Sequence, residues 1–241
     1  MDPAEVRKRH VSTGARLRSP QLMEQGTASI ARAKEDAAEL GARFPAAKIA
    51  EMEQLQAQVS GLFGDQAVAK TDVPSATAGE RAAFRAAKNL VGDCLAAATN
   101  TFEIEEPDVL DAFRAGAKIG QSVSKLKAKI ALLVPLATTH AAALDAWGEA
   151  DLAQRLTAAS EAVSAEEAAQ EMAMTDLPRK TAELYEAKGK LFFLIKRLNR
   201  AAKRVFKDAP EKARRYDLDV VYRRSGASPG GGGAQPTPPA S

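Results

Sequence analysis

The sequence predicts an all-α protein: an antiparallel bundle of about six main helices, built as two pseudo-repeated three-helix units. Three observations lead to this class. Alanine, the strongest helix former, occupies 51 of the 241 positions. Aromatic residues make up only 5% of the chain, and runs of the β-branched residues that favour strands are few. Apolar residues recur at helical spacing over most of the chain.

This spacing divides the chain into successive helical segments. We expect helices over 20–43, 46–63, 75–102, 107–146, 150–173 and 178–207, with a short last helix starting near Pro210. Proline is tolerated in the first turn of a helix, so Pro107 is expected to lie at a helix start, and Pro45 either ends the first helix or starts the next. Pro135 lies within the longest segment, where it predicts a kink.

The two ends of the chain differ from the part between them. Residues 1–19 form a polar, basic arm that we expect to be flexible. Residues 225–241 are mostly Gly, Pro, Ser and Ala, with no charge and no large apolar side chain, and are therefore predicted to be disordered. The remainder divides into helical repeat unit 1, residues 20–106, and helical repeat unit 2, residues 107–224, which begins with the long linking helix.

A ten-residue pattern, which we call the TDxP box, occurs twice. It reads AKTDVPSATA from Ala69 and AMTDLPRKTA from Ala173, 104 residues later. The same offset continues without a gap, with 10 identities in the 32 positions from 71 to 102. We interpret this similarity as tandem duplication of a three-helix unit. The alternative is two similar helix starts in an alanine-rich chain.

Each TDxP box is predicted to be a turn that starts a helix. Asp or Thr can cap the free N–H groups of a helix start, and Pro fits its first turn. In the first box Thr77 and Glu80 also have the spacing of a capping box. We therefore expect the boxes to have a structural role and not to bind a ligand.

No pattern in the sequence predicts catalysis or a metal site. Neither His10 nor His140 has a glutamate three residues before it, as the di-iron sites of helical bundles require. His140 is expected to lie on the surface or to pack, and Cys94 to be a small buried side chain. The chain contains no metalloprotease, nucleophile-elbow or dinucleotide motif. We thus predict no catalytic residue, no metal, no cofactor and no enzymatic activity.

Positive charge is concentrated near the end of the chain. The net charge is +3, but residues 179–224 contain 15 Lys or Arg against 6 Asp or Glu. In the helix predicted over 188–207, one side is apolar and the other carries six cations. These candidate contacts for an anionic partner are Lys196, Arg197, Arg200, Lys203, Arg204 and Lys207.

Three interpretations of these cations compete: a solvated face of a core helix, a docking surface for an acidic protein, and contact with nucleic acid or an anionic membrane. The repeat helps to weigh them. Positions 92, 93, 96, 99 and 100, which lie 104 residues before five of the cations, are Gly, Asp, Ala, Thr and Asn. This asymmetry favours a role beyond folding. No zinc-finger or RNP-type aromatic motif accompanies the cations.

The function that we expect from the sequence is that of a non-enzymatic helical interaction or structural protein. Its partner would be another protein or, by self-association, a second copy in a homodimer. The alternative is a nucleic-acid-associated protein that binds through the basic face of the 188–207 helix. The longest apolar run, residues 130–137, is too short to span a bilayer, and no secretory signal is visible. We therefore expect a cytoplasmic protein without a transmembrane segment.

Overall fold

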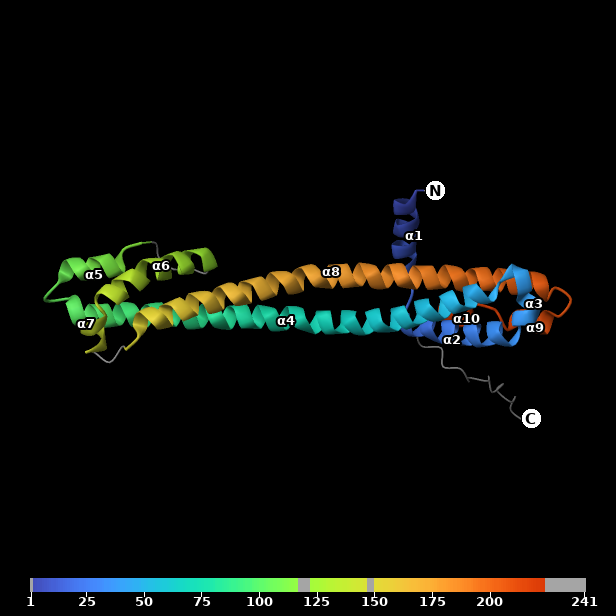
Figure 1. Cartoon of the computed structure of the whole chain (residues 1–241), viewed down its shortest axis with the longest axis horizontal. Helices are drawn as coiled ribbons and strands as arrows, with labels where there is room; N and C mark the ends of the chain where they lie inside the picture. The colour runs from blue at the N-terminus through green and yellow to red at the C-terminus, as the bar shows by residue number, and fades with distance from the viewer. Residues whose placement is uncertain (1, 117–121, 147–149, 224–241) are drawn as a thin grey trace, which may run out of the picture. The chain divides into compact units, whose positions relative to one another are not determined.

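The structure is a computed structural model that describes residues 2–116, 122–146 and 150–223 (Figure 1). All regular elements in these ranges are helices, which confirms the predicted all-α bundle class. The chain forms two compact units, each of which is described by itself. Unit 1 comprises Met1–Gln66 and Lys180–Ser241, and unit 2 comprises Ala67–Arg179.

Unit 1 contains the start and the end of the chain. Its elements are α1 (Pro3–Arg16), α2 (Ser19–Glu35), α3 (Ala37–Leu40), the 3-10 helix η1 (Gly41–Arg43), the first part of α4 (Ala46–Phe102), the last part of α8 (Leu152–Val205), α9 (Pro210–Arg214) and α10 (Asp219–Tyr222). Leu22, Met52 and Leu191, from three of these helices, belong to one buried core. Gln66 donates a hydrogen bond to Thr181 at 2.9 Å, and Arg43 lies near Arg204. Within this unit α4 and α8 are therefore antiparallel.

Unit 2 contains the middle of the chain. Its elements are the remainder of α4, α5 (Pro107–Arg114), α6 (Val123–Thr139), α7 (Ala141–Asp145) and the first part of α8. A second core includes Cys94, Leu126 and Leu156, each with 0% exposure. The expectation that Cys94 is a small buried side chain is thus confirmed. His140 packs edge-on against Phe102 with ring centroids 5.1 Å apart, which confirms its predicted packing role.

The predicted turns at the two TDxP boxes are wrong. α4 continues through Pro74 and α8 through Pro178, so neither proline starts a helix. Thr77 does not cap a helix, because its hydroxyl donates to the carbonyl of Val73 one turn earlier. Both prolines are exposed, so water can satisfy the carbonyls that lose their helical N–H partners. The free energy gained by burying apolar side chains before and after each box outweighs the free energy that a proline costs inside a helix.

The long linking helix predicted over 107–146 is also wrong. α5 ends at Arg114, and the chain starts α6 only at Val123, with Ser122 accepting a hydrogen bond from the amide of Lys125. Gly116 has a φ of 96°, a left-handed conformation that favours glycine and ends the helix. Pro135 lies inside α6, and a separate short helix, α7, begins at Ala141.

The arm predicted to be flexible over 1–19 instead contains helix α1. Asp2 accepts a hydrogen bond from the amide of Ala4 at 3.0 Å, Pro3 lies in the first turn, and Glu5 adds an acidic side chain there. These are the start signals of a helix, and tertiary contacts complete it. The predicted disordered tail, residues 225–241, lies outside the described residues.

The bounds of α2 and α6 reproduce the 104-residue offset of the sequence, and those of α4 and α8 differ from it by one or two residues. α2 spans 19–35 and α6 spans 123–139, so both bounds of α6 lie 104 residues after those of α2. α4 spans 46–102, and α8 spans 152–205. The cores of both units end in a stacked aromatic pair, Phe206 with Tyr216 and Phe102 with Phe113. Tandem duplication itself stays a prediction.

The compact units do not coincide with the predicted boundaries 20–106 and 107–224. Because α4 and α8 both pass through their TDxP boxes, each long helix contributes one part to each unit. Unit 1 therefore combines α2, α3 and the start of α4 with the end of α8, 104 residues or more further along the chain. A local turn at each box would have kept the two sequence repeats apart.

A candidate anion-binding site in unit 1

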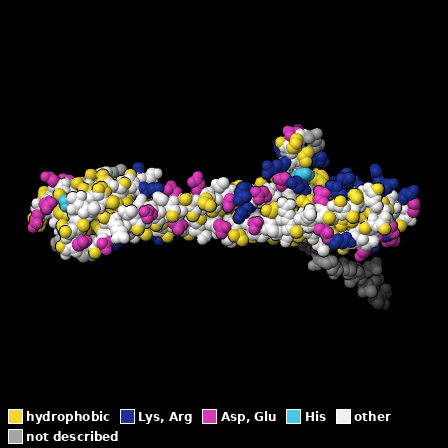
Figure 2. All heavy atoms as spheres, in the orientation of Figure 1, with side chains coloured by type: hydrophobic (Ala, Val, Ile, Leu, Met, Phe, Trp, Pro, Cys, Tyr) yellow, Lys and Arg dark blue, Asp and Glu magenta, His cyan; other side chains and the backbone are white. Residues whose placement is uncertain are grey.

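Five of the six cations predicted from the sequence lie in the last part of α8, on the side opposite the core of unit 1, and Lys207 lies in the turn that follows Val205. Leu191, Leu198 and Ala202 face that core with 1% exposure or less. Because a helix turns once every 3.6 residues, the intervening cations face solvent. Figure 2 shows Lys and Arg side chains gathered beside α1 and along α8. The face predicted to be basic is a solvent-facing surface of the folded unit.

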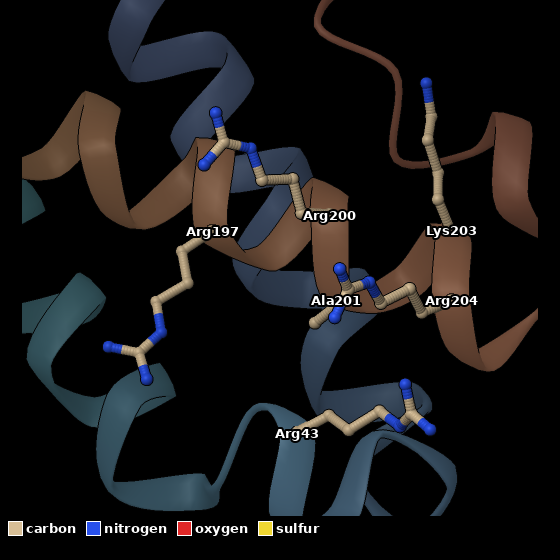
Figure 3. A pocket seen from close by; sticks show the side chains of 6 residues that line it. All are labelled: Arg43, Arg197, Arg200, Ala201, Lys203 and Arg204. Carbon is tan, nitrogen blue, oxygen red and sulfur yellow. The ribbon is translucent and has the colours of Figure 1, made fainter.

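Three predicted arginines meet a fourth arginine from another element. An open pocket of about 570 Å³ is lined by Arg43, Arg197, Arg200, Ala201, Lys203 and Arg204 (Figure 3). Arg43 comes from η1, immediately before α4, and lies across the pocket from Arg204. Sequence reasoning missed Arg43, because nothing in the spacing of the chain relates it to arginines more than 150 residues later.

These four arginines have no neutralising partner among the residues that the structure describes. In the described residues no carboxylate forms an ion pair with Arg43, Arg197, Arg200 or Arg204. All four side chains are exposed. A single anionic ligand in the pocket could therefore be contacted by several guanidinium groups at once.

The predicted lysines have other surroundings. Lys203 pairs with Asp217 at 2.8 Å, and Figure 3 shows its side chain extending away from Arg43. Lys207 lies 3.8 Å from Asp208, and Lys196 lies over the ring of Phe192, 5.6 Å from its centroid. Lys203 and Arg204 also occupy the last turn of α8, where positive charge stabilises a helix end. The structure thus brings the arginines together more closely than the lysines.

Helix α1 adds residues to the same side of unit 1. It lies across α8 (Figure 1), and Gly14 and Gly189 allow the two backbones to approach closely. A Cβ at Gly14 would overlap the carbonyl of Tyr185, and one at Gly189 would overlap the backbone of His10. The Nε of Arg7 donates to Glu186 at 2.8 Å and fixes the first half of α1.

Two pKa values reflect this contact. Hydrogen bonds from Lys190 and Arg7 lower the pKa of the Glu186 carboxyl despite its partial burial. They favour the charged carboxylate, which the ion pair with Arg7 of α1 requires. Burial, with the nearby charge of Lys190, lowers the pKa of the His10 imidazole. His10 is therefore mostly neutral at pH 7.

A second open pocket, of about 450 Å³, adjoins the first. Its lining includes Arg9, His10, Phe193 and Lys196, and it shares Arg197 and Arg200 with the first pocket. Arg9 and His10 lie in the basic arm, which sequence reasoning regarded as flexible and did not assign to a site. The only signal for them was the basic composition of the arm.

We define the basic surface of unit 1 as the six predicted cations together with Arg9 and Arg43. No group of three His, Cys, Asp or Glu side chains in the described ranges could hold a metal ion. None of the described helices has the length and apolar character needed to cross a membrane. Comparisons with models of protein families, with curated proteins and with solved structures found no match to this chain.

Proposed function

We propose that this chain is a helical binding protein that contacts nucleic acid through the basic surface of unit 1. The observation that carries the proposal is the pocket of four exposed arginines for which the described part of the chain provides no carboxylate partner. Like charges held close together repel one another, and a bound polyanion removes this repulsion. That the chain is not an enzyme and that it is cytoplasmic stay predictions from the sequence.

The chemistry of the cations favours phosphate as the ligand group. Guanidinium presents planar, paired donors that match two phosphate oxygens at once, whereas ammonium acts as a point charge. Four arginines and one lysine, Lys203, line the pocket. From Lys196 to Arg204 the face extends over about 12 Å at 1.5 Å per residue. A polymer with regularly spaced phosphates can contact the whole face, whereas a single phosphate reaches one pocket.

Packing argues against membrane insertion by α8. The large apolar side chains of its last part, among them Leu191, Ile195 and Leu198, lie in the core of unit 1. Insertion would require them to leave that core, at a cost of several kcal/mol for each pair of large side chains. An anionic bilayer could then be bound only through surface charge. Nucleic acid has a much higher density of phosphate along its axis and fits the narrow row of arginines better.

A binding titration with matched variants tests this proposal. Fluorescence anisotropy would follow the binding of labelled 30-nucleotide single-stranded and duplex DNA over a series of salt concentrations. We expect the variant R197Q/R200Q/R204Q to weaken binding strongly and to reduce the slope of log K against log salt by about 2 to 3. The control, R81Q/R85Q/K88Q, removes three exposed cations from α4 in unit 2 and should leave the slope unchanged.

Three results would overturn the proposal. The first is no binding to either DNA at low salt. The second is an equal loss of affinity in the triple variant and in its control. The third is that the chain binds anionic vesicles or polyglutamate in place of DNA, and that this binding depends on Arg197, Arg200 and Arg204.

Self-association is a second candidate function, and one observation in unit 2 favours it. Val68, Met172 and Met174 expose 57%, 69% and 57% of their surfaces, which is unusual for large apolar side chains. Met172 also lines an open groove with Ala69, Ala76 and Ala169, where small side chains allow another helix to approach. Light scattering should show a dimer that M172K/M174K dissociates. A single monomer mass at high concentration would contradict this candidate.

A further inference from the structure

One aromatic side chain on the basic surface has no place in the core of unit 1. Phe192 is 6% exposed and belongs to that core, but the next residue, Phe193, is half-buried and does not. The ring of Phe193 instead contacts α1, with the His10 ring 5.5 Å away and the Arg9 guanidinium 5.1 Å from its centroid. A large apolar ring thus lies among cations at the surface.

The surroundings of Phe193 form an open pocket and not a filled contact. The second pocket of unit 1 brings the ring together with His10, Arg9 and Lys196, and Arg197 and Arg200 connect it to the pocket of four arginines. Aromatic rings beside a row of cations form the usual recognition surface for single-stranded nucleic acid, in which bases stack while cations follow the backbone.

We infer that this second pocket receives an unpaired base of single-stranded nucleic acid, with Phe193 as the stacking platform. The inference rests on the proposed function and specifies its ligand. The phosphates on the two sides of that base would be held by Arg197 and Arg200 and by the adjoining arginine pocket. In a duplex the base faces are covered by their neighbours, so only an unpaired base can reach the ring.

Helix α1 keeps the pocket assembled. The close contact at Gly14 and Gly189 and the ion pair between Arg7 and Glu186 hold His10 beside the ring. In the free protein the Arg9 guanidinium covers part of the ring. A base that stacks on Phe193 displaces this guanidinium, which is then free to contact a phosphate of the same strand. Binding of a base therefore removes one cation–ring contact and adds one charge-assisted hydrogen bond.

The test compares single-stranded with duplex DNA in the full-length chain. F193L retains an apolar side chain against α1 but removes the flat ring. We expect it to weaken binding of single-stranded DNA about tenfold, as loss of one base–aromatic stack does, and to leave duplex binding unchanged. The slope of log K against log salt should also stay unchanged, because no cation is lost. F193W should retain or increase the affinity, and circular dichroism would check that both variants fold.

The matched control is F84L in unit 2. Phe84 also lies beside three cations, Arg81, Arg85 and Lys88, but it packs against the core of its unit. Its substitution should not change binding of single-stranded DNA. Equal effects of F84L and F193L, or equal losses for single-stranded and duplex DNA, would overturn the inference. If F193L has no effect while R197Q/R200Q/R204Q still weakens binding, the inference fails and the proposed function stands. If the wild-type chain binds no DNA at low salt, both fail.

Discussion

The two units contain similar cores but different surfaces. At the end of α8 and directly after it, Leu198, Ala202 and Phe206 are buried in unit 1. In α4 the residues 104 positions earlier, Cys94, Ala98 and Phe102, are buried in unit 2. The outward positions differ. Arg197, Arg200 and Arg204 in α8 correspond to Asp93, Ala96 and Asn100 in α4. Folding alone therefore requires no cations at these positions, and the arginines of unit 1 need another explanation.

Buried polar groups differ between the units as well. In unit 1 the side-chain amide of Gln25 donates a hydrogen bond to the carbonyl of Asp217. The position 104 residues after Gln25 is Lys129 in unit 2, and its ammonium donates to the carbonyl of Phe113 at 2.7 Å. Burial lowers the pKa of the Lys129 ammonium. Both side chains satisfy carbonyls of the segment that follows the long helix. Positions 104 residues apart thus each carry a buried hydrogen-bond donor, an amide in unit 1 and an ammonium in unit 2.

The largest expected effect tests whether the two cores are equivalent. Phe206→Ala in unit 1 and Phe102→Ala in unit 2 each remove a buried ring stacked on a second aromatic ring, at centroid distances of 6.1 and 5.9 Å. Each should lower the free energy of unfolding by about 3–5 kcal/mol. Urea titration followed by circular dichroism would measure both. A loss below about 1 kcal/mol for one of them would contradict the equivalence of the cores.

The next effect concerns a contact that unit 1 has and unit 2 lacks. The Tyr216 hydroxyl donates to Asp36 at 2.8 Å, and Lys212 pairs with the same carboxyl at 2.9 Å. In unit 2 the aromatic residue is Phe113, beside His140. Tyr216→Phe should destabilise the protein by about 1–3 kcal/mol, because the buried carboxylate loses a donor. Tyr222→Phe, at an exposed tyrosine of the same unit, should change the unfolding midpoint very little.

The pKa of Asp36 gives this contact a pH dependence. Burial acts to raise the pKa of the carboxyl, but hydrogen bonds from Lys212 and Tyr216 outweigh burial and hold that pKa below its ordinary value. The contribution of Asp36 to stability is therefore complete above the unfolded-state pKa of about 4 and is lost as the pH falls through the lower folded-state value. Acid titration of Tyr216→Phe should show a smaller loss of stability in this window than the wild type.

A smaller effect tests the contact between α1 and α8. Gly189→Ala should displace α1, because the added methyl group would overlap the backbone of His10. Gly61→Ala, in the part of α4 that belongs to unit 1, places its methyl group in open space and should stabilise the helix by about 0.5–1 kcal/mol. Limited trypsin digestion at Arg7 and Arg9 would compare the two. Equal cleavage rates would contradict the close contact.

The smallest effect is the response of α1 to pH. Burial and Lys190 lower the pKa of His10 in the folded chain, while Glu186 acts in the opposite direction and Arg9 adds to the decrease. The unfolded state then binds more protons, so this contribution to stability is complete above a pH of about 6.5 and declines as the pH falls below it. Trypsin cleavage of α1 should therefore increase modestly at pH 5.5. His10→Gln should abolish the increase that titration of His10 causes.

Helical spacing was sufficient to predict the fold class and the burial of Cys94, because apolar side chains every three or four residues define one face of a helix. It failed where distant packing decides the local structure. Pro74 and Pro178 resemble helix starts, yet burial on both sides keeps α4 and α8 continuous. Gly116, which ends α5, was not recognised as a helix break because its neighbours continue the apolar pattern.

The candidate site likewise contains residues that the sequence could predict and residues that only the folded structure brings there. The cations of α8 could be predicted because they share one face of one helix. Arg43 and Arg9 could not, since only the folding of η1 and α1 against α8 brings them to that face. The stacking position of Phe193 depends on its exclusion from the core, which the sequence alone does not distinguish from the burial of Phe192.

The most direct test of the difference between the two units is lysine footprinting of the full-length chain with and without single-stranded DNA. Acetylation of each lysine would be measured by mass spectrometry at low salt. We expect DNA to protect Lys196, Lys203 and Lys207 in unit 1 and to leave the exposed Lys88 and Lys125 of unit 2 unchanged. Protection of Lys88 and Lys125 to the same extent, or of none of the five, would contradict the assignment of nucleic-acid binding to the basic surface of unit 1.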